Sequence, residues 1–202
     1  MILYARSRLS RTILLNFGSV SMQNTEDTMS GPVVGTLLPL GALLSGTHDD
    51  GGDVYPLHSS FRDFLTDEKR SGDFYVGSAS DYHGDLALTC LKIMTRDLHF
   101  NMAKLENSYV LNRDVAEFSS KVNTKISRAL SYACRNWTWH LEKYEAAEKD
   151  FAGLDIIIAW AKSLFLFWLE TLALEKQTTE AVPAYTFLVK WIKVIFTPLK
   201  KS

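Results

Sequence analysis

The chain has 202 residues, of which 47% are hydrophobic and 22% are charged, and its formal net charge at pH 7 is −1. This composition is that of a folded globular protein, and it excludes a disordered chain. The near-neutral charge supplies no broad basic field, so nucleic acid is not expected as a partner. Cys90 and Cys134 form no C-x-x-C pair, which predicts buried thiols in a cytoplasmic protein and neither a disulfide framework nor a zinc site.

Residues 1–17 contain Arg6, Arg8 and Arg11 and no acidic residue. Such a segment fits either a transit peptide or an internal helix. Its apolar part is short and no small-residue cleavage pattern follows, which favours the internal helix.

The apolar run at 33–45 is interrupted by glycine and proline, which predicts a short helix or turn leading into a strand at 42–45. A glycine turn at 50–52 follows, and the next apolar run, 54–58, predicts a second strand. Because Pro56 cannot donate a hydrogen bond to a neighbouring strand, this second strand is expected at a sheet edge. Two short strands around a glycine turn predict a β-hairpin.

A helix is predicted directly after the hairpin, since Ser60 and Asp63 have the S-x-x-D spacing of a capping box. His58 lies between the second strand and this helix. It fits two roles: it caps the helix, or it reaches a group outside this chain. A helix N-terminus has free N–H groups and a positive end, so a histidine there can donate to an anion. The residue types alone favour the capping role.

The chain beyond residue 81 has apolar residues at spacings of three and four, the pattern of helices. Helices are predicted over 81–98, 126–144, 154–176 and 184–197, with Pro183 between the last two. In the second of these, an apolar face continues for about four turns. His140 lies at its edge and is predicted to be a core histidine with one satisfied nitrogen.

The most apolar segment, 154–174, carries Asp155, Lys162 and Glu170. On a helical wheel these charges fall in one sector. This predicts a single buried helix with one solvent-exposed stripe and disfavours a membrane span. Trp137, Trp160, Trp168 and Trp191 lie among apolar helical residues, so all four are expected in the core.

Motifs for catalysis and cofactor binding are absent from the sequence. There is no phosphate loop of the G-x-x-x-x-G-K-[ST] type, no G-x-G-x-x-G, no G-x-S-x-G and no H-E-x-x-H. The five histidines do not cluster at the spacing of metal ligands. We therefore expect no catalytic residues, no metal site and no cofactor in the isolated chain, and we do not expect an enzyme.

The order of several segments resembles the region downstream of the NTPase core in large fungal NACHT–WD40-repeat proteins, a family of signal-transducing NTPases. The segment "PLHSSFRDFLTDEKRSGDFYV" resembles the end of their winged-helix region. "HGDLALTCLKIM", "LHFNMAKLENSY", "ISRALSYACRNWTWHL" and "FLFWLETLAL" resemble the segments that follow it, and "VVGTLLPLGALLSGTHDD" resembles the stretch just before it. The likeness covers about residues 33–175.

The resemblance implies a role for His58, because Leu57-His58-Ser59 aligns with a Met-His-Asp-type motif. In that family the histidine reaches from the winged helix to the phosphate of ADP bound on the NTPase core and holds the inactive state. Ser59 stands where the motif has an acid, so that acid's restraint is lost or replaced. The phosphate loop, the metal-binding acid and the WD40 repeats are missing from this sequence.

The fold expected from these patterns is mainly α: a winged-helix-like segment with a short β-hairpin, at 1–72, followed by an α-helical bundle or the start of a solenoid, at 73–202. The expected function is that of a non-catalytic regulatory fragment of a NACHT-type nucleotide switch, whose partner is an NTPase core absent from this chain. The alternative is a free-standing helical interaction module that self-associates through 154–197 or lies on a membrane surface.

Overall fold

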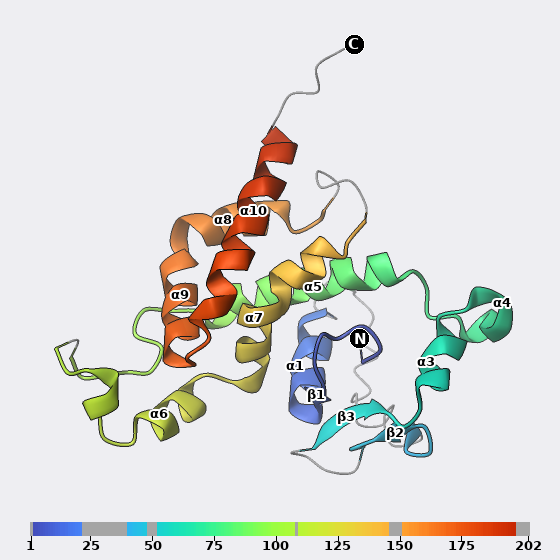
Figure 1. Cartoon of the computed structure of the whole chain (residues 1–202), viewed down its shortest axis with the longest axis horizontal. Helices are drawn as coiled ribbons and strands as arrows, with labels where there is room; N and C mark the ends of the chain where they lie inside the picture. The colour runs from blue at the N-terminus through green and yellow to red at the C-terminus, as the bar shows by residue number, and fades with distance from the viewer. Residues whose placement is uncertain (1, 22–39, 48–51, 108, 146–150, 197–202) are drawn as a thin grey trace.

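Helices make up most of the molecule, shown as a computed structural model in Figure 1. The structure describes residues 2–21, 40–47, 52–107, 109–145 and 151–196. The helices are α1 (Arg11–Ser21), α3 (Ser59–Leu65), α4 (Glu68–Ser71), α5 (Ala79–Asp97), α6 (Phe118–Lys125), α7 (Arg128–Glu142), α8 (Leu154–Ser163), α9 (Phe165–Leu174) and α10 (Ala181–Phe196). The strands are β1 (Leu9–Ser10), β2 (Leu44–Ser45) and β3 (Asp53–Pro56), and the 3₁₀ turns are η3 (Gly72–Phe74), η4 (Asn112–Asp114) and η6 (Thr178–Glu180). The predicted mainly α fold, with a hairpin followed by a helical bundle, is confirmed.

The small sheet contains the predicted hairpin and one strand that was not predicted. Antiparallel β2 and β3 form the hairpin, and β1 pairs with the other side of β3, giving the order β1-β3-β2. The edge position expected for the second strand is therefore wrong, because β3 is central. Pro56 is tolerated there because β1 pairs only as far as Val54, so no β1 carbonyl faces the proline nitrogen. The expected helix or turn at 33–39 and most of the glycine turn lie outside the described residues.

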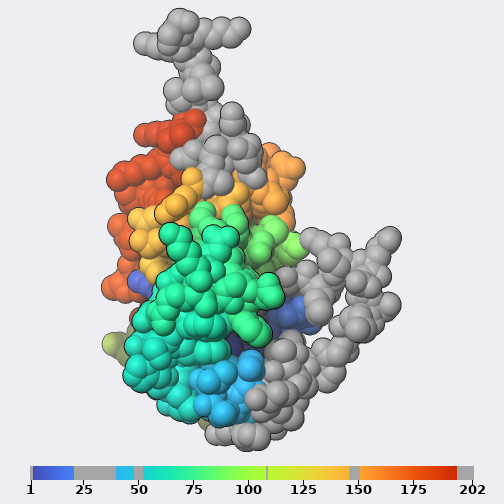
Figure 2. All heavy atoms as spheres, turned by 90° about the vertical axis from the view of Figure 1, so that its right-hand side faces the viewer, coloured from blue at the N-terminus to red at the C-terminus, as the bar shows by residue number. Residues whose placement is uncertain are grey.

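The hairpin leads into α3 and α4, which lie at one end of the molecule (Figure 1). In the view onto that end, residues around α3 and α4 cover the face, with β2 below them (Figure 2). Asp67 caps α4 by accepting hydrogen bonds from the N–H groups of Lys69 and Arg70 at 3.1 and 3.3 Å. Residues 68–71 thus form a separate short helix after α3.

The centre of the molecule is the pair α5 and α7, which make the most extensive contact between described elements. The expected N-terminal helix is present as α1, and it packs against both central helices with Ile13, Leu14, Phe17 and Val20 buried. One hydrophobic cluster extends from Tyr4 to Trp191. It includes residues from both sides of the boundary expected at residue 72, which stays a prediction.

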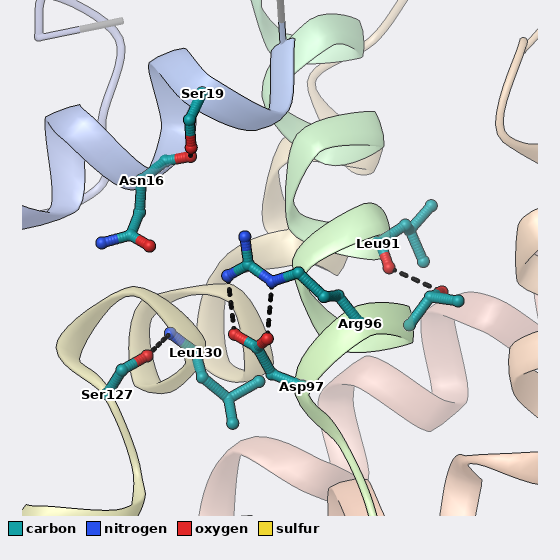
Figure 3. Close-up of polar contacts among 8 residues, drawn as sticks. Asn16, Ser19, Leu91, Arg96, Asp97, Ser127 and Leu130 are labelled. Atoms are coloured by element: carbon teal, nitrogen blue, oxygen red, sulfur yellow. Dashed lines mark hydrogen bonds and ion pairs between the residues drawn. The ribbon is translucent and has the colours of Figure 1, made fainter. Parts of the chain in front are cut away.

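Helix α7 has the apolar face that its sequence predicts. Ser127 caps its start by accepting the Leu130 N–H at 3.1 Å, beside the Arg96–Asp97 ion pair at the end of α5 (Figure 3). The buried face also includes the polar Asn136. The Asn136 amide donates to the Tyr132 carbonyl at 2.8 Å, which satisfies it inside the core.

The segment 154–174 forms two helices, so the prediction of one helix with a solvent-exposed stripe is wrong. α8 and α9 meet at Leu164 with a bend of 74°. Asp155 and Lys162 are exposed on α8, whereas Glu170 on α9 is half-buried and accepts the Met102 N–H at 3.1 Å. Among the described helices none alone is long and apolar enough to cross a membrane; only the bent pair α8–α9 together has that length and composition.

The last described helix, α10, begins earlier than expected. Pro183 lies within its first turn, where a missing N–H is tolerated, so the proline does not separate the helices. The separation comes from residues 175–180, which include η6. Trp191 is only 6% exposed, and the other three tryptophans predicted for the core are each 1% exposed, which confirms the expectation.

Candidate functional site

His58 lies at the junction of β3 and α3 and is the N-cap of α3. Its backbone is extended (φ −140°, ψ 143°), and its Nδ1 accepts the Ser60 N–H at 3.1 Å. The Ser60 hydroxyl lies 2.8 Å from the same nitrogen. The capping box predicted from Ser60 and Asp63 is therefore wrong, because the helix begins at Ser59 and the imidazole provides the acceptor that a serine or aspartate oxygen usually provides.

The cap determines which hydrogen-bonding group His58 presents to the outside. Since Nδ1 accepts a backbone N–H, the hydrogen of the neutral ring is on Nε2. His58 is exposed, and its Nε2 has no partner among the residues that the structure describes. The two roles considered for His58 are thus compatible in geometry: one nitrogen caps α3 and the other can donate to an external acceptor.

Two exposed leucines lie close to His58. Leu57, its neighbour in the chain, is 58% exposed, and Leu43 is 43% exposed. The backbone N–H of Leu57 donates to the Leu43 carbonyl at 3.0 Å, which places these two residues on adjoining positions. None of the residues of α3 is fully buried. This end of the molecule, seen face-on in Figure 2, therefore presents the His58 donor next to two exposed leucines.

Arg62 on α3 turns toward the body of the protein. Its guanidinium lies 5.9 Å from the centroid of the Tyr4 ring, which is the geometry of a weak cation–π contact.

Two further histidines lie close together inside the core. The Nδ1 atoms of His83 on α5 and His140 on α7 are 2.9 Å apart, and the His140 Nε2 is 2.9 Å from the Tyr132 hydroxyl. The Arg6 backbone N–H donates to that hydroxyl at 3.3 Å. His140 is fully buried. The core position predicted for His140 is correct, but both of its nitrogens are satisfied instead of one.

One assignment of hydrogens satisfies every contact in this network with both histidines neutral. Because Arg6 donates to the Tyr132 oxygen, the Tyr132 hydrogen is available for the Nε2 of His140. His140 then carries its hydrogen on Nδ1 and donates it to His83, whose own hydrogen is on Nε2. Both rings are neutral in this arrangement.

Burial favours the same neutral state. The pKa of His140 is lowered from 6.5 to about 3, first by desolvation and then by the positive charge of the neighbouring His83. Desolvation also lowers the pKa of His83, with added effects of the positive Lys143 and Arg62. The pKa of the Tyr132 hydroxyl is raised by burial. The cluster therefore ties the N-terminal segment to α5 and α7 as a neutral, hydrogen-bonded connection.

Sequence reasoning missed the partners in this cluster. His83 and His140 are 57 residues apart, and no local pattern links them. In the described parts of the chain, no group of three or more His, Cys, Asp or Glu side chains is arranged to hold a metal ion. Cys90 and Cys134 are buried and free, as predicted.

Comparisons with known proteins identified no relative of this chain. No protein-family model, no curated protein and no solved structure matches this sequence. The resemblance to NACHT proteins thus stays a prediction, and a function has to be argued from the geometry of the residues themselves.

Proposed function

We propose that this chain is a non-catalytic regulatory region of a NACHT-type nucleotide-switch protein, and that the surface around His58 docks on an NTPase core. The observation that supports this proposal is the outward Nε2 donor of His58, held in place because Nδ1 caps α3. A neutral imidazole donor beside a helix N-terminus suits a phosphate oxygen. The exposed Leu57 and Leu43 supply apolar surface for contact with the core.

The test joins the chain to a NACHT NTPase core and measures the release of a fluorescent ADP analogue. His58→Ala should speed release by roughly 5- to 150-fold, which corresponds to a loss of about 1–3 kcal/mol for one hydrogen bond to a charged group. This substitution also removes the cap of α3. His58→Asn separates the two effects, because asparagine is a good N-cap but its shorter side chain withdraws the outward donor.

Both His58 variants should release ADP faster than the parent protein. The matched control is His99→Ala, which removes another exposed histidine far along the chain and should leave release unchanged. If His58→Asn retains ADP as well as histidine does, the residue acts only as a cap and the proposal fails.

A second candidate function, self-association through 154–197 or lying on a membrane surface, is favoured by the exposed side of α10. Val182 is 70% exposed, Tyr185 is 55% exposed and Val194 is 57% exposed, and Lys190 is exposed nearby. Trp191 cannot serve as a membrane anchor because it is buried near Phe151, with ring centroids 6.1 Å apart.

Flotation with anionic vesicles tests the membrane surface, and a measurement of oligomeric state tests self-association. Vesicle binding that is lost in Lys190→Glu would support the membrane surface. A concentration-dependent dimer that is lost in Tyr185→Glu would support self-association. A monomer that does not float would exclude both.

A further inference from the structure

A cavity of about 460 Å³ is lined by parts of the chain that are far apart in sequence. The segment before β1, the first half of α7 and the residue that follows α9 all contribute to it. Its polar lining includes Arg8, Arg128, Arg135, Ser131, Tyr132 and Glu175. The volume lies in the range of small-molecule sites, about 300–1,000 Å³.

Each of the three guanidinium groups is held by the protein on one side. The Arg8 guanidinium stacks over the Tyr55 ring at 4.0 Å from its centroid. Arg128 is paired with Asp53, with Nη2 and Oδ1 3.2 Å apart. The Arg135 Nε donates to the Ser131 carbonyl at 3.2 Å. These contacts orient the arginines around one space, which is the arrangement that a bound anion requires.

The arginines are not neutralised equally. Within the described part of the chain, Arg8 and Arg135 have no carboxylate at ion-pair distance, and the two terminal nitrogens of the half-buried Arg135 have no hydrogen-bond partner. Planar guanidinium groups with unused N–H groups suit the oxygens of a phosphate, which can accept from more than one arginine at once.

The start of α7 adds to the attraction for an anion. This helix has 15 residues, and its N-cap Ser127 immediately precedes Arg128 (Figure 3). Arg128 and Ser131, both in the cavity lining, belong to its first turn and a half. The positive end of the helix therefore lies beside the same space as the guanidinium groups.

Glu175 adds a hydrogen-bond acceptor to a cavity lining that otherwise offers mainly donors. Its Oε2 is buried and has no hydrogen-bond partner among the described residues. A buried carboxylate oxygen without a donor is unfavourable, and a ligand that brings a hydroxyl or amino group would satisfy it. The cavity thus offers several donors for an anion and one acceptor for a hydrogen-bond donor.

We propose that this cavity binds a small phosphorylated compound that also carries hydroxyl or amino groups. The phosphate lies against Arg8 and Arg135, and a hydroxyl or amino group donates to Glu175. The site is distinct from the surface around His58, since His58 is absent from its lining. It also differs from a phosphate loop, because its cations come from positions 8, 128 and 135 and not from one contiguous motif.

Ribose 5-phosphate and inorganic phosphate are suitable probes, because both carry a phosphate but only the first brings hydroxyl groups on a carbon frame. Isothermal titration of the full chain at low ionic strength should give a dissociation constant for ribose 5-phosphate on the order of 1 mM or tighter. Inorganic phosphate should bind about tenfold more weakly, since it leaves part of the cavity unfilled. No heat of binding with either probe at about ten times that concentration would overturn the proposal.

Two substitutions test whether ribose 5-phosphate binds in this cavity. Arg135→Gln should weaken binding of ribose 5-phosphate by about tenfold or more, because it removes a partly desolvated charge. Arg113→Gln is the matched control: it makes the same change at an exposed arginine that pairs with Asp114 outside the cavity, and it should leave affinity unchanged. Equal affinity of Arg135→Gln and the parent chain, with both folded by circular dichroism, would place the binding elsewhere and refute the site.

Glu175→Gln tests the acceptor. Removing the negative charge should strengthen the binding of inorganic phosphate while reducing the advantage of ribose 5-phosphate over it. If the parent chain binds the two probes equally well, the role proposed for Glu175 is wrong.

Discussion

The buried pair of histidines makes stability depend on pH, and His140 is the residue to perturb. In the folded chain, burial lowers the pKa of His140 to about 3, whereas its ordinary value is 6.5. Between these two values the unfolded chain binds a proton at this residue and the folded chain does not. The contribution of His140 is therefore fully present above pH 6.5 and is lost as the pH falls toward 3.

The magnitude follows from the proton linkage. Each pH unit in this window costs about 1.4 kcal/mol for one proton, so lowering the pH from 7 to 5 should cost about 2 kcal/mol through His140. The pKa of His83 is lowered as well, so its contribution has the same sign. A loss of this size is a large part of the 5–15 kcal/mol that is typical of a folded domain.

Urea unfolding followed by tryptophan fluorescence at the two pH values measures the effect. His140→Gln keeps a donor and an acceptor in the core but cannot titrate, so its loss on acidification should be smaller than that of the parent chain by about 2 kcal/mol. His99→Gln, at an exposed histidine, should behave like the parent. If the parent and His140→Gln lose the same free energy of unfolding, the reasoning from burial is refuted.

Three further predictions concern the core. Ser127→Ala removes the cap of α7 and should lower the free energy of unfolding by about 1 kcal/mol in urea; no change would show that the cap contributes nothing. The Trp168 indole donates to the Cys134 carbonyl at 2.8 Å, whereas the Trp137 indole N–H has no partner among the described residues, so Trp168→Phe should destabilise more than Trp137→Phe by about 1 kcal/mol in the same assay. Burial raises the pKa of the Cys90 and Cys134 thiols, so a thiol reagent should label them only after unfolding; rapid labelling of the native chain would contradict their burial.

Helices with a clear apolar face were predictable from the sequence, and α7 shows why. Its buried positions recur at helical spacing, and Ser127 provides a recognisable cap. The bend between α8 and α9 left no such signal, because residues 154–174 contain neither glycine nor proline. It arises from tertiary packing: α8 contacts α5, α9 contacts α7, and the rings of Trp160, Phe165 and Trp168 fill the corner.

The candidate sites were harder to predict from the sequence than the helices. His58 stood out because it interrupts an apolar stretch beside a helix start, and both of its possible roles could be stated. The cap itself was assigned to Ser60, because histidine is not among the residues usually preferred at that position. The partnership of His83 with His140, and the convergence of arginines on one cavity, depend on how α1, α5 and α7 pack together. No local pattern encodes such long-range contacts.

The packing of α1 on α5 and α7 has a consequence for the order of events during synthesis. The buried face of α1, which includes Phe17, contacts Tyr132, with the two ring centroids 5.5 Å apart. When α1 leaves the ribosome, this partner has not yet been made. At about 5–20 residues per second, more than a hundred residues take roughly 5–20 seconds to follow. During that interval α5, the other native partner of α1, is synthesised first, so the apolar face of α1 is covered in two steps and is complete only when α7 has emerged.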